Sequence, residues 1–152
     1  MNTKTFVGTV ISDGDNILLC HSCERGTWII PCGVVKPLDT FRNDRLTLAL
    51  LCMRDLKEKT GLTHYKLNSF NYLGKYDVVW GEVLELFYIF DKHIRTFPLT
   101  GILNCESFFE REGRWFKKVD EFKSIPINQI DKYCEKRMAQ ILAKAFESLR
   151  SK

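Results

Sequence analysis

The chain has 152 residues, a length that favours one domain with its own hydrophobic core, and we expect that domain to span residues 1–152. Hydrophobic residues make up 45% of the sequence and charged residues 28%, which indicates a globular protein and excludes a disordered chain. The net charge of +4 suits an anionic small-molecule ligand, whereas nucleic-acid-binding domains usually carry a denser basic patch.

The sequence gives no sign of a membrane segment or a targeting signal. No apolar run approaches the roughly 20 residues that are needed to cross a bilayer. The first residues lack the long apolar segment of a signal peptide, which predicts a cytoplasmic location. The six cysteines are then expected to be reduced thiols. Nothing in the sequence indicates an oligomeric state.

Three strands are predicted near the N-terminus. Residues 5–10 and 16–20 are rich in β-branched and aliphatic side chains. The turn signal Ser12-Asp13-Gly14-Asp15 between them predicts a β-hairpin. Residues 27–30 form a third, short strand that ends at Pro31, and a loop is expected after it.

Residues 43–60 have a helical pattern. Asp55 and Glu58 lie next to each other on a helical wheel of ~100° per residue, and Lys59 lies near Asp55. Gly61 is a natural end for the helix, because glycine takes the left-handed conformation without a Cβ penalty. The opposite side of the wheel, which should face the core, carries Ala49, Cys52, Met53 and Leu56.

The rest of the chain predicts more strands and a final helix. Residues 70–73 and 83–90 are expected to be strands, and the second is apolar enough to lie centrally in a sheet. A short strand is expected at residues 115–116, and a helix with an apolar stripe from about residue 128. This order predicts a mixed β-sheet with helices packed on it, in the α/β (α+β) class.

The most informative segment is Arg-Asp-Leu-Lys-Glu-Lys-Thr-Gly-Leu at residues 54–62, which stands downstream of Pro31-Cys32-Gly33. It resembles the end of the Nudix box. That motif begins with a Gly, which is followed by five residues, a Glu and seven more residues. It ends with Arg-Glu-apolar-x-Glu-Glu-x-Gly-apolar. The preceding Trp28-Ile29-Ile30-Pro31-Cys32-Gly33 is similar to the family's Trp-x-x-Pro-Gly-Gly. The resemblance implies a Nudix-type α/β/α sandwich. The matched positions are Gly33, Asp39, Arg54, Asp55, Leu56, Glu58, Gly61 and Leu62.

The spacing of the box departs from the family pattern. Gly33 and Arg54 are 21 positions apart, seven more than in the family. Seven residues make close to two helical turns at 3.6 residues per turn, so an insertion between Asp39 and Arg54 lengthens the helix without rotating its face. An ungapped alignment anchored on Arg54 puts Leu46 in place of the first Glu. We prefer the gapped alignment, because Lys36-Pro37-Leu38-Asp39-Thr40 is similar to the family's loop.

Lys59 stands where the family has a glutamate that usually binds metal. A hard cation such as Mg²⁺ needs several oxygen ligands, and an ammonium supplies none. Two alternatives follow for this side chain. Lys59 pairs with Asp55 and weakens the metal site, or it binds a phosphate directly as a point charge.

The resemblance implies roles for the remaining box residues. Asp55, Glu58 and Asp39 would hold Mg²⁺ (or Mn²⁺), together with a backbone carbonyl near Gly33. Arg54 would orient the carboxylates by bidentate pairing. Aspartate in place of glutamate at position 55 shortens the reach by one methylene, which is the scale at which site geometry fails.

Residues outside the box complete the candidate set. Many family members take a general base from the loop before the late strand, and Glu112 is preferred there over Glu110. Trp28 is a candidate for stacking on a nucleobase. The stretch Cys20-His21-Ser22-Cys23 contains metal-ligand types, but one such group without a second predicts buried cysteine rather than a metal centre.

Three functions follow from the resemblance. The first is a metal-dependent pyrophosphohydrolase that cleaves a nucleoside diphosphate linked to another group, with a small-molecule nucleotide as substrate. The second is a Nudix-fold module that binds a nucleotide, an RNA end or a protein partner without turnover, as Lys59 suggests. The third, processing of an RNA end, receives little support from a net charge of +4.

Overall fold

The computed structural model describes residues 4–36, 44–78, 81–94 and 105–151. Its strands are β1 (Thr5–Ser12), β2 (Asn16–Ser22), β3 (Thr27–Ile29), β4 (Cys32–Val34), β5 (Asn71–Asp77), β6 (Val83–Phe90), β7 (Phe108–Arg111), β8 (Arg114–Lys117) and β9 (Val119–Pro126). Its helices are α1 (Arg45–Thr60), α2 (Ile130–Tyr133) and α3 (Lys136–Arg150). Within these ranges, no helix is long and apolar enough to cross a membrane.

The main sheet is mixed, as the sequence predicts. Its strand order is β3-β2-β1-β6-β5, with β4 paired to β1 and β9 paired to β2. β1 and β6 run parallel, whereas the other described pairs of this sheet are antiparallel. β6 lies inside the sheet between β1 and β5, which confirms the central strand expected at residues 83–90.

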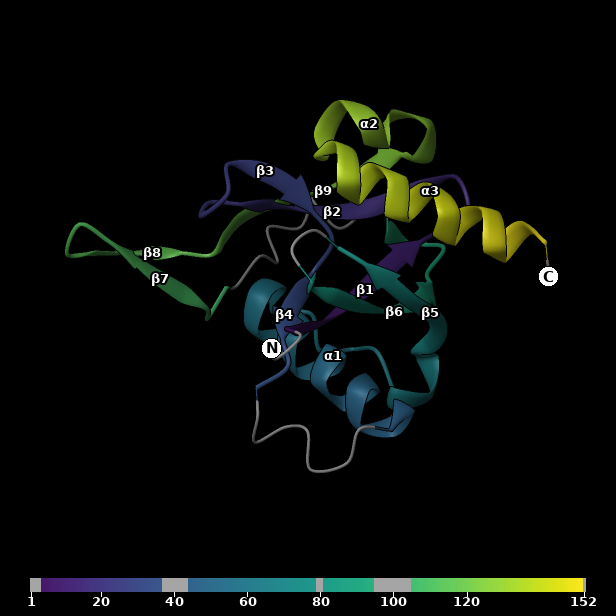
Figure 1. Ribbon diagram of the computed structural model, residues 1–152, viewed down its shortest axis with the longest axis horizontal. Coiled ribbons are helices and arrows are strands. Elements are labelled where there is room, and N and C mark those ends of the chain that lie inside the picture. The colour runs from purple at the N-terminus through teal and green to yellow at the C-terminus, as the bar shows by residue number, and fades with distance from the viewer. Residues whose placement is uncertain (1–3, 37–43, 79–80, 95–104, 152) are drawn as a thin grey trace.

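Helices cover both faces of this sheet, with α1 on one face and α3 on the other (Figure 1). Alternation along β1 explains the two layers, since Val7 and Ile11 face the α1 layer while Val10 faces the α3 layer. Buried Leu56 of α1 and Leu142 of α3 belong to these two separate cores. The α/β/α sandwich implied by the resemblance is therefore confirmed.

The ends of α1 follow from local chemistry. The Asp44 side chain caps the first turn by accepting a hydrogen bond from the Thr47 backbone N–H at 2.8 Å. Gly61 ends the helix in the left-handed conformation, with φ of 80°, and its N–H donates to the Lys57 carbonyl. The predicted helix is thus confirmed from Arg45 to Thr60, and its end at Gly61 as well.

The C-terminal region differs from the single helix expected from about residue 128. A 3₁₀ turn (Ile127–Gln129) leads into the one-turn helix α2, and α3 begins only after a break. Cys134 has an extended backbone at this break, with φ of −95° and ψ of 155°. The Cys134 side chain is buried in the hydrophobic core between the sheet and α3. The break before the last helix therefore directs this side chain into the core.

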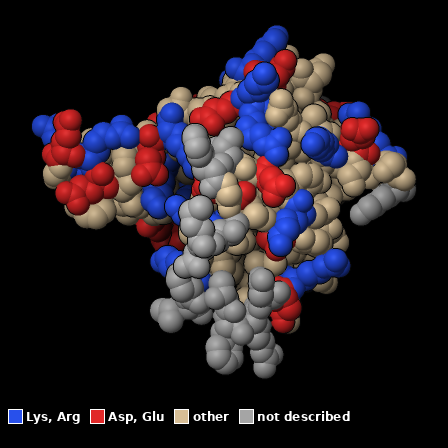
Figure 2. Space-filling model, viewed as in Figure 1, with Lys and Arg blue, Asp and Glu red and all other residues tan. Residues whose placement is uncertain are grey.

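β7 and β8 form a separate two-stranded sheet that projects from the body of the molecule (Figure 1). The sequence predicts only a short strand at residues 115–116, so β7 was missed. Trp115 is 68% exposed, and Phe108 and Phe116 are also exposed. Acidic and basic side chains are mixed over this hairpin and over the face drawn in Figure 2. That mixture differs from the dense basic patch of a nucleic-acid-binding surface.

Candidate functional site

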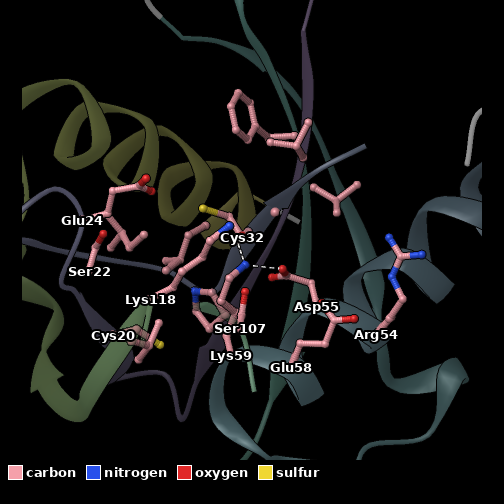
Figure 3. Close-up of a pocket in the computed structure, with 18 of the residues that line it drawn as sticks. Cys20, Ser22, Glu24, Cys32, Arg54, Asp55, Glu58, Lys59, Ser107 and Lys118 are labelled. Atoms are coloured by element: carbon pink, nitrogen blue, oxygen red, sulfur yellow. Dashed lines mark hydrogen bonds and ion pairs between the residues drawn. The ribbon is translucent and has the colours of Figure 1, made fainter. Parts of the chain in front are cut away.

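A pocket of about 300 Å³ lies between α1, the β3–β4 segment and the start of β9 (Figure 3). Five cationic side chains line it, namely Arg25, Lys36, Arg54, Lys59 and Lys118. Three acidic side chains line it as well, namely Glu24, Asp55 and Glu58. The pocket therefore has a surplus of two positive charges and favours an anionic ligand.

Lys59 connects α1 to β4 at one end of this pocket. Its ammonium Nζ lies 2.5 Å from Asp55 Oδ1, four residues earlier on the helix, and donates to the Cys32 carbonyl at 2.8 Å. The Lys59 and Asp55 side chains are each only 11% exposed. Figure 3 shows Lys59 between Cys32 and Asp55. The sequence left two alternatives for Lys59, pairing with Asp55 or binding a phosphate. The structure has the ion pair with Asp55.

Burial and pairing both act on the charges of this ion pair. Burial raises the pKa of the Asp55 carboxyl above 3.8, while attraction to Lys59 offsets part of the shift. Burial also lowers the pKa of Lys59, but the adjacent carboxylate and its hydrogen bond outweigh that effect, so the pKa rises above 10.5. Lys59 is consequently a permanent cation at neutral pH.

Asp55 itself is buried, although the helical wheel placed it opposite the apolar face. It is 8% exposed because β4 covers this side of α1. Gly33 on β4 allows this close approach, since a Cβ on that residue would lie 2.3 Å from Asp55 Oδ1. Gly33 thus makes room for the carboxylate that Lys59 holds.

Gly33→Ala is expected to lower the free energy of unfolding by about 1–3 kcal/mol, because the new methyl group must displace the paired carboxylate. Chemical denaturation of the variant measures this loss. Val34→Ala is the matched control, since the neighbouring side chain on the same strand is 40% exposed and its truncation should matter little. Equal stability of the two variants would contradict a close contact at Gly33.

Arg54 and Glu58 are exposed residues of α1 that also line the pocket. Figure 3 shows Asp55 directed toward Lys59, whereas the Arg54 side chain extends away from that pair. The Glu58 backbone carbonyl accepts a hydrogen bond from the Glu106 N–H at 2.6 Å, which anchors the chain after residue 104 to the helix. The orienting role of Arg54 and the ligand role of Glu58 stay predictions.

Of the other predicted site residues, those that the structure describes do not line this pocket. Asp39 lies outside the described residues. Glu112 stands in the turn between β7 and β8, with φ of 53°, and Glu110 is exposed on β7. Neither glutamate lines the pocket. Trp28 packs against His21 and Tyr133, with ring centroids 5.3 and 6.0 Å away, so the structure gives it a packing role.

Sequence reasoning missed Arg25 and Lys118 as cations of the pocket. The position of Lys118 is fixed through its backbone, whose N–H donates to the Ser107 carbonyl at 2.8 Å and whose carbonyl accepts from the Cys23 N–H at 3.0 Å. Its charge favours the ionised form of Asp55. Neither residue belongs to a motif, and contacts between segments distant in the sequence, such as the pairing of β2 with β9, bring them together.

The contacts of Lys59 do not fit a divalent metal ion bound between Asp55 and Cys32. Mg²⁺ requires near-octahedral oxygen coordination. The Asp55 carboxylate and the Cys32 carbonyl are two of the expected oxygen ligands, and Lys59 donates a hydrogen bond to each of them. The buried ammonium also repels a second cation at the same place.

No protein-family model and no curated protein matches this sequence. Among solved structures, the Nudix domain of Shewanella oneidensis NrtR, complexed with ADP ribose, matches with a TM-score of 0.64 at 16% identity. The match covers 99% of this chain and 88% of that one. The C-terminal domain of mouse MUTYH, in a complex with human PCNA, matches with a TM-score of 0.62 at 9% identity, covering 99% of this chain and 91% of that one.

A third similar structure is a bifunctional NMN adenylyltransferase/ADP ribose pyrophosphatase from Francisella tularensis, complexed with AMP and a Mn ion. It matches with a TM-score of 0.63 at 12% identity, covering 96% of this chain and 42% of that one. Likeness at such identities is evidence of shared architecture. Together with the layers and the strand order described above, it establishes that the chain has the fold of the Nudix hydrolases.

Proposed function

We propose that this chain binds the phosphate groups of a nucleoside diphosphate derivative in the pocket beside Lys59, without a divalent metal ion. The contact of Lys59 Nζ with both Asp55 and the Cys32 carbonyl carries the proposal. A side chain of the protein thereby supplies the positive charge at this end of the pocket.

The donors of the pocket support phosphate as the ligand. An ammonium has three hydrogen-bond donors, and the bonds of Lys59 to Asp55 and Cys32 use two of them. We expect the third to bond to a phosphate oxygen in the pocket that Lys59 lines. Arg25 and Lys118 add further cationic groups from other segments, and phosphate recognition commonly uses such groups.

The similar structures support a nucleotide as the class of ligand. The NrtR domain is complexed with ADP ribose, and the Francisella tularensis protein with AMP. The volume of about 300 Å³ lies at the lower end of the range for small-molecule sites, which suits a phosphate-bearing part of a ligand.

Calorimetric titration with ADP-ribose in the presence of a chelator tests the proposal. We expect binding that the chelator leaves unchanged and that Lys118→Ala weakens by roughly tenfold, the loss of about one charge-assisted hydrogen bond. Lys57→Ala is the matched control, because Lys57 is an exposed lysine of α1 that does not line the pocket. Binding that requires Mg²⁺, or no binding with any nucleotide, contradicts the proposal.

A second candidate function is metal-dependent hydrolysis, which is favoured by the presence of Asp55 and Glu58 in one pocket of a Nudix fold. It requires that Lys59 release its two oxygen partners. Incubation with nucleoside triphosphates, dinucleoside polyphosphates, ADP-ribose and nucleotide sugars, each with Mg²⁺ or Mn²⁺, tests it. Product that Glu58→Gln abolishes would establish the hydrolase and replace metal-free binding as the function.

A further inference from the structure

A second group of ligand-type side chains lies outside the pocket, where β2 meets β9. It consists of His21, Cys23 and Asp120, and one ligand atom from each lies within 4.8 Å of the others. His21 Nδ1 is 2.8 Å from Asp120 Oδ1. None of the three lines the pocket beside Lys59, so this group is independent of the function proposed above.

A β-bulge brings Asp120 to this position. His21 pairs with Glu121 and Ser22 pairs with Val119, so Asp120 is the extra residue on β9. A bulge redirects the side chain of its extra residue, and here the carboxylate meets the imidazole of His21. The sequence alone could not reveal this juxtaposition, because Asp120 is 99 residues from His21.

The two residues from the β2 side are held in place by separate contacts. The Cys23 backbone N–H donates to the Lys118 carbonyl at 3.0 Å, which fixes the start of the loop after β2. The His21 ring packs against Trp28 with 5.3 Å between ring centroids. The His21 side chain is 29% exposed and that of Asp120 is 54% exposed, so an ion can reach both.

We propose that His21, Cys23 and Asp120 bind one Zn²⁺ ion. Zinc accepts nitrogen, sulfur and carboxylate oxygen together, whereas Mg²⁺ and Ca²⁺ select oxygen ligands. Bond lengths of about 2.0–2.3 Å in a tetrahedral site place ligand atoms roughly 3.3–3.7 Å apart. Side-chain rotations that move these atoms by about 1 Å are enough to form that geometry from the present one. Three protein ligands leave the fourth position to water.

Metal analysis of the full chain tests this site. The protein is stripped with a chelator, incubated with Zn²⁺ and desalted, and zinc is measured per chain. We expect one Zn²⁺ per chain, with affinity at least ~10-fold lower in His21→Ala, Cys23→Ser and Asp120→Asn. Substitution with Co²⁺ adds a spectroscopic readout, since thiolate-to-cobalt absorption should appear in the wild type and disappear in Cys23→Ser.

His64→Ala is the matched control. His64 Nε2 also lies near a carboxylate, 3.7 Å from Asp91 Oδ2. Neither His64 nor Asp91 belongs to the group of His21, Cys23 and Asp120. This variant should bind zinc as the wild type does. The proposal is overturned if the wild type retains no zinc, or if Cys23→Ser and His21→Ala bind as tightly as His64→Ala. Cys23→Ser preserves shape at a half-buried position, so loss of folding does not obscure the result.

Discussion

Lys59→Met is expected to lower the free energy of unfolding by about 3 kcal/mol at neutral pH. The substitution leaves the Asp55 carboxylate 8% exposed and without its cation, and removing one partner of a buried ion pair typically costs about 3–5 kcal/mol. It also removes the donor to the Cys32 carbonyl. Urea denaturation measures the loss, with Lys57→Met as the exposed control on the same helix, where a change within about 0.5 kcal/mol is expected.

The pH dependence of this loss identifies its cause. Burial raises the pKa of Asp55 above the unfolded value of 3.8, and without Lys59 nothing on α1 offsets that shift by direct pairing. A raised carboxyl pKa costs stability at pH values above the unfolded pKa, and the cost disappears below it, where both states are protonated. The difference between Lys59→Met and the wild type should therefore shrink as the pH falls toward 3.8.

A double substitution provides the decisive comparison for this prediction. Asp55→Asn combined with Lys59→Met removes both charges, and it should recover much of the stability lost in Lys59→Met alone. If Lys59→Met alone is as stable as Lys57→Met at every pH, the Asp55–Lys59 ion pair contributes nothing to the free energy of unfolding.

Lys59→Glu is expected to create a site for Mg²⁺ or Mn²⁺ where the wild type has the Lys59 ammonium. The substitution adds a carboxylate beside Asp55 and Glu58 and releases the Cys32 carbonyl, so several oxygen atoms converge on one point. Without metal, repulsion between these carboxylates should make the variant less stable than the wild type. Saturating metal at about 100 times Kd should restore roughly 2.7 kcal/mol, visible as a rise in Tm.

Lys57→Glu is the control for this experiment, because it makes the same charge change at an exposed position of α1. Neither this variant nor the wild type should gain stability from Mg²⁺. If the wild type binds Mg²⁺ as tightly as Lys59→Glu does, Lys59 does not exclude the ion and the hydrolase candidate gains weight. If Lys59→Glu hydrolyses a nucleotide and the wild type does not, the side chain at position 59 determines whether the protein binds or hydrolyses its ligand.

Much of the fold could be predicted because it rests on local patterns. β6 is a strand inside the sheet with one charged residue, Glu85, among apolar and aromatic ones, and α1 has a capping residue at one end and Gly61 at the other. The apolar stripe of the helix and its carboxylates also follow from spacing alone. The box residues 54–60 lie on α1 and Gly61 ends it, as predicted, because the helical period and the glycine stop are local signals.

The rest depends on contacts between distant segments. The helical wheel divides α1 into an apolar and a polar side, but β4 covers part of the polar side and buries Asp55. Lys118 reaches the pocket through the pairing of β9 with β2 and through its backbone hydrogen bonds to Ser107 and Cys23. Glu112 was expected near the box because of its place in the sequence, yet the β7–β8 turn holds it on a projecting hairpin.

The bond from Lys59 to the Cys32 carbonyl also closes a loop, since its partners are 27 positions apart. Closing a flexible loop costs conformational entropy that grows only with the logarithm of its length, about 0.6 kcal/mol for each doubling. The gapped alignment puts the seven additional residues of the box inside this loop, where we expect them to add only a small entropic cost. The hydrogen bond from Lys59 to the Cys32 carbonyl connects the last turn of α1 to β4. The segment between them can therefore vary in length while α1 and β4 keep their relative position at the pocket.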